Sequence, residues 1–210
     1  MKQPNFTIIR DLQELPSFIS STRSFSISAP LQVGTEFIIA VCYARGDVSE
    51  CVCIHVSVEQ AKEIADILFS DHERRVIVHA VKEIMVWFLR HGVELYAEMF
   101  LDVSLAAYLL SPPEPDLGED WRSFILSALL EKYLQEPYPV LYKRVLAADY
   151  PEFFYRHLVQ DARYVWRLGP MLVKPILSDE TLLQAYWALE ILLTSVLAEI
   201  ECGGIGLDRA

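Results

Sequence analysis

The stretch 36-EFIIAVCYARGDVSECVCIHVSV-58 decides the fold class, because it reads as two strands joined by a tight turn. Its first half is a continuous apolar run, and its second half alternates apolar and polar residues as a half-buried strand does. Between the two halves, ARGD (44–47) carries the glycine and aspartate typical of a hairpin turn. The preceding stretch RSFSISAP (23–30) also alternates. The sequence therefore predicts three adjacent strands, antiparallel to one another.

Outward from this hairpin, helix patterns and strand patterns follow in turn. Ser57 is a suitable N-cap for an amphipathic helix, and RRVIVHA (74–80) is a short apolar run typical of a buried strand. Next come a helix that ends at Gly92, a brief strand, and a helix stopped by Pro112. Beyond the acidic, proline-rich loop 112–121, every segment has a helical pattern. Strands that alternate with helices predict a sheet with helices packed on it.

The bulk composition limits the possible functions. Apolar residues make up 53% of the 210 residues and charged residues 22%, which supplies a core and excludes a disordered chain. The formal net charge of -11 argues against a free-standing nucleic-acid binder, which needs a basic face. We therefore expect a single α/β domain over residues 1–210, with a mixed sheet flanked by helices.

The cysteines and the N-terminus indicate the compartment. No CxxC pair or zinc-type His/Cys set is present, so we expect four buried, reduced thiols, at Cys42, Cys51, Cys53 and Cys202. Residues 1–16 lack the apolar run of a signal peptide, and no segment has the roughly 18 uninterrupted apolar residues of a membrane span. The sequence predicts a cytoplasmic protein with no membrane partner.

Three segments, taken in order, resemble the 3′–5′ exonuclease domain of bacterial DNA polymerase I. They are LRHGVELYAEMFLDVSLAAYLLSP (89–112), RHLVQDARYVWRL (156–168) and LLTSVLAEIECGGIGLD (192–208). The resemblance spans nearly the whole chain and implies a ribonuclease H-like sheet. It also implies that residues 182–210 connect toward an absent polymerase domain. The partner it implies is the polymerase domain of the same or a neighbouring chain, with weak contact to DNA.

The resemblance implies a pair of divalent metal ions held by acidic side chains, and the sequence departs from that pattern on the first strand. The family has an Asp-x-Glu pair there. This sequence has Ser26 and Ser28, or Ser28 and Pro30 if the register moves by two. Neither register supplies a carboxylate.

The remaining family positions are only partly kept. The aspartate expected on the helix after the fourth strand falls at Ile84, one residue from Glu83. The family's Tyr-x3-Asp motif keeps its spacing as His157 and Asp161. Asp102 matches a family aspartate that is structural. Asp161 is thus the one expected ligand that stands in place.

One carboxylate cannot hold two divalent ions, so we expect a vestigial, catalytically inactive exonuclease domain. It would need no cofactor and would have a structural, DNA-positioning role in replication and repair. Asp161 would be a relic ligand or, more simply, a solvated helix residue near Arg156 or Arg163.

Two alternatives stay open. The first is an active 3′–5′ exonuclease in which Mg²⁺ or Mn²⁺ is held by displaced acids, drawn from Glu83, Asp102 and Asp161. The second is a stand-alone protein-interaction module. An exposed apolar face on the last helix, 182–201, would favour a missing protein partner.

Overall fold

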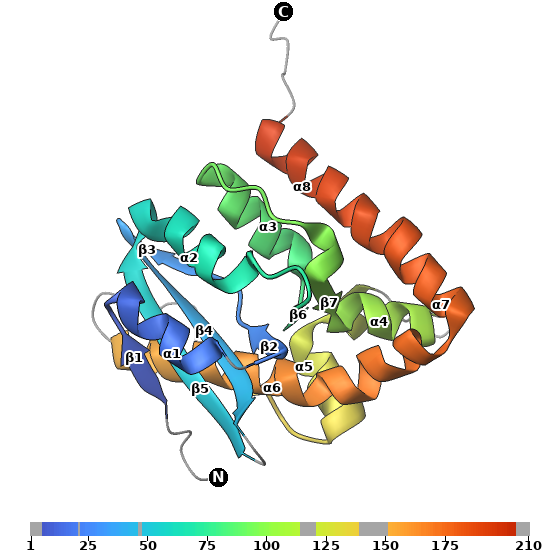
Figure 1. Cartoon of the computed structure of the whole chain (residues 1–210). Coiled ribbons are helices and arrows are strands. Elements are labelled where there is room, and N and C mark those ends of the chain that lie inside the picture. The colour runs from blue at the N-terminus through green and yellow to red at the C-terminus, as the bar shows by residue number, and fades with distance from the viewer. Residues whose placement is uncertain (1–5, 21, 46–47, 114–120, 139–150, 205–210) are drawn as a thin grey trace, which may run out of the picture.

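The computed structural model of the chain describes residues 6–20, 22–45, 48–113, 121–138 and 151–204. Within these ranges seven strands form one sheet in the order β1-β5-β4-β2-β6-β7, and β3 continues the line of β2 along β4 (Figure 1). The strands are β1 (Thr7–Ile9), β2 (Ser24–Ile27), β3 (Leu31–Val33), β4 (Glu36–Arg45), β5 (Val48–Ser57), β6 (Arg75–Val78) and β7 (Phe100–Asp102).

The hairpin of β4 and β5 is the centre of this sheet. The two strands pair antiparallel over their whole length, from Glu36 opposite Ser57 to Arg45 opposite Val48. β2 pairs antiparallel with β4, so the prediction of three antiparallel strands is confirmed. β6 lies parallel to β2, β7 to β6, and β1 to β5. Among the described strands β4 alone runs against the rest, which gives the mixed sheet of a ribonuclease H-like fold. The predicted turn at 44–47 lies partly outside the described residues.

Both faces of the sheet are covered, which explains why its central strands are so apolar. Successive residues of a strand point to opposite faces. In β4, Phe37 and Ile39 join the larger core, while Ile38 and Ala40 join a smaller core. The larger core is shared with η1 (Leu12–Glu14), α1 (Leu15–Ile19), α2 (Ala61–Phe69) and α3 (Val81–Arg90), and η2 (Val58–Gln60) leads into α2.

The smaller core lies under α6 (Pro151–Ser178), which crosses the opposite face behind the strands (Figure 1). This helix contacts β2, β4, β5 and β6. The helix lies close to the sheet at Gly169, where a Cβ atom would lie 2.9 Å from Cδ1 of Ile77 on β6. Any larger residue at 169 would push the helix away from the sheet or displace Ile77.

The last described segment is one continuous helix from Glu180 to Gly203, made of α7 (Glu180–Ala185), η7 (Tyr186–Ile191) and α8 (Leu192–Gly203). The hydroxyl of Tyr186 bonds the carbonyl oxygen of Phe100 on edge strand β7, at 3.3 Å, and α8 packs on α3. By length and composition alone the helix could cross a membrane, with a mean hydropathy of 1.4 and 22% of its most apolar window buried. The core helix of a soluble protein can also meet the criteria of length and composition, so one such helix is weak evidence for a membrane span.

The other described helices lie between β7 and α6 in the chain or lead into β7. They are η3 (Ala97–Met99), α4 (Val103–Leu110), η5 (Trp121–Phe124), α5 (Leu126–Leu129) and η6 (Leu130–Leu134).

The four cysteines are free thiols, and three of them, Cys42, Cys51 and Cys53, are buried in the smaller core. The prediction of four buried thiols is wrong for Cys202, which is only partly buried near the end of α8. Its Sγ lies 3.5 Å from the carbonyl oxygen of Val86 on α3.

Candidate functional site

The two serines at the first-strand acid positions are buried and use their hydroxyl groups to hold the backbone. Ser26 Oγ donates a hydrogen bond to the carbonyl oxygen of Ala162 on α6 at 2.6 Å. Ser28 Oγ accepts one from the backbone N–H of Ala40 on β4 at 3.0 Å. Their exposed fractions are 0% and 2%. Pro30, the position of the alternative register, is half-buried beyond the end of β2. Ser26 therefore joins the sheet to α6, and Ser28 joins the end of β2 to β4.

The helix position expected to carry an aspartate is part of the hydrophobic core. Ile84 on α3 is completely buried among apolar side chains. Glu83 is exposed, as expected for a neighbour that lies roughly 100° around the helix. A carboxylate at 83 thus faces away from the position that 84 occupies.

Asp102, at the junction of β7 and α4, has a structural role. Its Oδ2 accepts the N–H of Val81 at 2.6 Å, and its Oδ1 accepts both the N–H and the Oγ–H of Ser104, at 2.7 and 2.6 Å. It thereby caps α4 and fixes the start of α3, just after Ala80, which has a left-handed backbone with φ 58°. Both carboxylate oxygens of this buried residue already have donors, in agreement with the structural role that the resemblance implies.

Asp161 and His157 form a polar cluster with Tyr138. The hydroxyl of Tyr138 lies 2.8 Å from Asp161 Oδ1 and 3.1 Å from His157 Nε2, and His157 Nε2 lies 3.4 Å from Asp161 Oδ2. The side chains of Asp161 and His157 are 20% and 17% exposed. The expectation of a solvated Asp161 beside an arginine is therefore wrong, and Arg156 pairs instead with Glu152 at 2.7 Å.

The surroundings of this cluster change its protonation. Burial raises the pKa of Asp161 to about 7, although the hydrogen bond from Tyr138 opposes the rise. Burial lowers the pKa of His157 to about 4. Near neutral pH the imidazole is therefore uncharged and the carboxyl group is only partly ionised. Such a pair is a weak ligand for hard cations such as Mg²⁺ and Mn²⁺, which favour charged oxygen ligands.

The side chains at these positions do not fit a two-metal centre. In the described ranges, no group of three or more His, Cys, Asp or Glu side chains is placed so as to hold a metal ion. Of the displaced acids considered from the sequence, Asp102 is committed to backbone donors and Glu83 is exposed. The structure does not bring them together with Asp161 as ligands of one ion.

The sequence analysis did not identify a second polar cluster, which is centred on His55 of β5. His55 Nε2 lies 2.8 Å from Glu36 Oε2, its Nδ1 bonds the hydroxyl of Tyr155, and Arg10 donates to that hydroxyl at 3.2 Å. The groups form a chain of hydrogen bonds that runs from Arg10 through Tyr155 and His55 to Glu36. Centring the hairpin on residues 46 and 47 would have placed Glu36 diagonally across from His55.

Solved structures of two proteins share this fold. The POL domain of Pol1 from M. smegmatis, in complex with a DNA primer-template and dNTP, matches with a TM-score of 0.68 and 21% identity. That match covers 97% of this chain and 33% of the Pol1 chain. NrnC from Brucella melitensis matches with TM-scores of 0.61 bound to pGG and 0.60 with bound Mg²⁺, at 16% identity, over 95% of this chain and 92% of NrnC.

The chain has an exonuclease-like, ribonuclease H-like fold. At these identities the likeness concerns the fold, and the chain spans about a third of the Pol1 structure, 33% of its length. No family model matches the sequence, and no curated protein matches it.

Proposed function

We propose that this chain is a vestigial 3′–5′ exonuclease-like domain of a DNA polymerase I-type protein, which no longer cleaves nucleic acid and has a structural, DNA-positioning role in replication and repair. The observation that carries the proposal is the use made of the acid positions. Ser26 holds the backbone of α6, and Ile84 fills the core. These positions contribute to packing where an exonuclease would have metal ligands.

The two structural likenesses support different settings for such a domain. The match to Pol1 covers 97% of this chain and supports a place beside a polymerase domain, on the same or a neighbouring chain. The match to NrnC covers 92% of that protein, which supports a stand-alone protein of this size. We favour the polymerase setting because the segments 89–112, 156–168 and 192–208 resemble that family in order.

Metal binding and cleavage test the proposal together. Mn²⁺ is titrated calorimetrically into the purified chain up to millimolar concentration, and nucleotide release is followed from single-stranded DNA labelled at its 3′ end. We expect neither saturable binding nor release. Glu152→Ala is a matched control for Asp161→Ala, since Glu152 lies on the same helix and is exposed. Metal-dependent release that Asp161→Ala abolishes and Glu152→Ala retains would overturn the proposal.

A protein-interaction module is the second candidate function. Six apolar residues on the outer side of the terminal helix are between 44% and 64% exposed, which favours a protein partner. The displaced-acid exonuclease has no comparable support, because Asp102 is fully engaged by backbone donors.

A further inference from the structure

The side of the terminal helix that faces away from α3 is apolar and exposed. Four residues along it form what we call the outer seam, with exposed fractions of 64%, 54%, 49% and 54%: Leu189, Leu193, Val196 and Ile200. Their spacing of four, three and four residues is that of the a and d positions of a coiled coil. Leu192 and Leu197 widen the seam, at 46% and 44% exposed.

The terminal helix has two apolar faces. One packs against the rest of the domain, and the outer seam is the other. Ile191, Thr194 and Ala198 are buried, and α8 packs on α3. At 3.6 residues per turn, positions 193, 196 and 200 fall on the opposite side of the helix from these three. Figure 1 shows the helix along the outside of the molecule, beyond α3. A contiguous apolar stripe of this kind is typical of an interaction surface, whereas singly exposed apolar residues are ordinary.

The terminal helix that carries the seam is acidic. The sequence has no lysine or arginine between Lys174 and Arg209, while four glutamates lie on the terminal helix: Glu180, Glu190, Glu199 and Glu201. Glu201 already pairs with two cations of α3, Lys82 at 2.7 Å and Arg90 at 3.8 Å. Glu199 instead lines a groove beside the helix.

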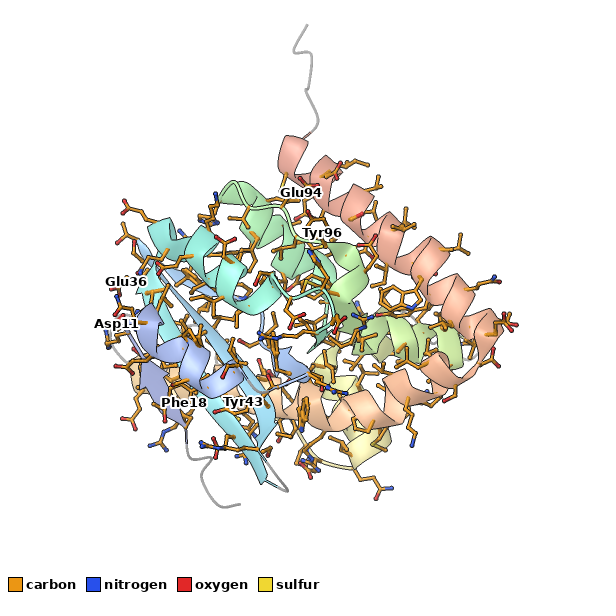
Figure 2. All side chains as sticks on the ribbon, in the orientation of Figure 1. Asp11, Phe18, Glu36, Tyr43, Glu94 and Tyr96 are labelled. Carbon is orange, nitrogen blue, oxygen red and sulfur yellow. The ribbon has the colours of Figure 1, made fainter. Side chains whose placement is uncertain are left out.

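That groove combines apolar and acidic groups. It measures about 180 Å³ and runs between α8, α3 and the stretch 94–98, with Leu192, Tyr96 and three glutamates in its lining: Glu94, Glu98 and Glu199. Tyr96 is 63% exposed. Figure 2 places Glu94 and Tyr96 at the side of the terminal helix. An apolar seam with carboxylates along one margin is complementary to an amphipathic helix that carries cations beside its apolar stripe.

We propose that the outer seam and this acidic groove bind an amphipathic, basic helix of a partner polypeptide. Its apolar side chains would pack on the seam, and its lysine or arginine side chains would reach Glu94, Glu98 and Glu199. The inference rests on the proposed structural role, for which it supplies the chemistry of the partner. The partner helix can belong to another chain or to another part of a longer protein.

The negative charge of the chain and of this surface argues against three other binding partners: a second copy of the chain, nucleic acid and an anionic membrane. A second copy of a chain with a net charge of -11 would bring like-charged margins together. Nucleic acid would be repelled by the same carboxylates. Helices that bind anionic membranes carry lysine and arginine on their polar face, and this helix has neither.

Two synthetic peptides test the proposal against the full chain. Both are about three heptads long with leucine at a and d, and they differ only at e and g, which are lysine in one and glutamate in the other. Binding is measured by fluorescence anisotropy at low salt. We expect the basic peptide to bind at least about tenfold more tightly, with an advantage that shrinks as salt is added.

Three variants assign the binding to the proposed surface. The double variant Leu193→Glu/Val196→Glu should lose binding of the basic peptide. The triple variant Glu94→Gln/Glu98→Gln/Glu199→Gln should bring the two peptides to within about twofold of each other. Leu177→Glu is the matched control, because Leu177 is 48% exposed on α6, outside the seam, and it should bind as the unchanged chain does. Circular dichroism and thermal unfolding verify that each variant is folded.

Several results would overturn the proposal: no peptide binding by the folded chain, equal binding of both peptides, binding unaffected by the seam variant, or tighter binding to anionic lipid vesicles than to the basic peptide. Sedimentation that shows a dimer abolished by Leu193→Glu/Val196→Glu would assign the seam to a second copy instead. The metal and cleavage assays separate the two proposals. A chain that binds the basic peptide and also releases nucleotides would refute only the proposed function. A chain that does neither would refute only the proposed docking surface.

Discussion

Two aspartates of this domain lie in contrasting surroundings. Asp102 is buried at the junction of β7 and α4, and its carboxylate accepts three hydrogen bonds from Val81 and Ser104. Asp161 lies on α6, and the hydroxyl of Tyr138 is the donor that bonds it. Its pKa is raised to about 7, since burial outweighs that single bond. Burial alone therefore does not give an aspartate a structural role. That role depends on how many hydrogen-bond donors surround its carboxylate.

The strongest test of this comparison is to place a third carboxylate in an apolar environment that offers it no hydrogen-bond donor. Ile84→Asp puts one in the apolar core, at the position where an exonuclease would have a ligand. We expect a loss of about 4 kcal/mol or more in the free energy of unfolding, measured by urea denaturation. The exposed neighbour provides the control, because Glu83→Asp should change stability by less than about 0.5 kcal/mol. A stable Ile84→Asp variant that gains Mn²⁺ affinity would contradict this prediction, because it would show that the fold can still accommodate a metal ligand at position 84.

Removing the well-satisfied carboxylate should have the next largest effect. Asp102→Ala leaves the buried N–H of Val81 and the partly buried N–H of Ser104 without their acceptor, and we expect a loss of about 3 kcal/mol in the free energy of unfolding. Ser104→Ala removes one of the three bonds and should cost about 1 kcal/mol. Urea denaturation of both variants is the measurement. Equal losses would show that Asp102 contributes no more than its bond to the Ser104 hydroxyl.

Asp161, which has one hydrogen-bond donor, should make the stability of the fold depend on pH. The pKa of Asp161 rises from 3.8 to about 7 on folding, so the folded state binds more protons, and stability falls as pH rises through that interval. The pKa of His157 falls from 6.5 to about 4, so its contribution rises with pH over that interval. Below about pH 6.5 the two trends largely cancel, and above it the remaining loss comes from Asp161.

Asp161→Asn separates these two opposing contributions. It should leave only the His157 trend, so that the stability of the variant rises from pH 4 to 6.5 and exceeds that of the unchanged chain at pH 8. We expect a gain of about 2 kcal/mol at pH 8, below the full value of the shift because the carboxyl group keeps some contact with water. Thermal unfolding across this range is the measurement, with His157→Gln as the reciprocal variant. Parallel curves for Asp161→Asn and the unchanged chain would contradict the argument.

The smallest expected effect is that of the single donor. Tyr138→Phe removes the hydroxyl that bonds Asp161, and we expect the pKa of Asp161 to rise further, with a loss of about 1 kcal/mol at pH 8. Carbon-detected NMR of the side-chain carboxyl group measures the titration directly. Tyr133→Phe is a suitable control on the neighbouring helix η6. A titration that stays unchanged in Tyr138→Phe would show that water, and not Tyr138, solvates the carboxylate.

Much of the fold could be predicted because its signals are local. The hairpin of β4 and β5, the cap at Ser57 and the stop at Pro112 each depend on residues within a few positions of one another. β3 was missed because a three-residue strand, Leu31–Val33, is too short to show a period. The half-buried state of Cys202 depends on how α8 lies against α3, which its own segment does not specify.

For the candidate site, the sequence indicated which positions to compare with the exonuclease family, but not the contacts that the side chains at those positions make. Aligned motifs indicated that Ser26, Ser28 and Ile84 replace acids, and the structure adds what those residues do instead. The hydrogen bond from Tyr138 to Asp161 could not be predicted, since Tyr138 lies 23 residues earlier in the chain. Contacts between distant residues leave no periodic signal in either segment, so their chemistry appears only once the chain is folded.

The hydrogen bond from Ser26 to Ala162 joins residues 136 positions apart. Closing so long a loop is slow compared with forming the β4–β5 hairpin, so we expect α6 to dock late in folding. Until it docks, the side of the hairpin that carries Cys42, Cys51 and Cys53 has no cover. These thiols are then open to oxidants during synthesis and after thermal opening, and protected at other times. A single helix thus sets the period during which the chain is chemically vulnerable.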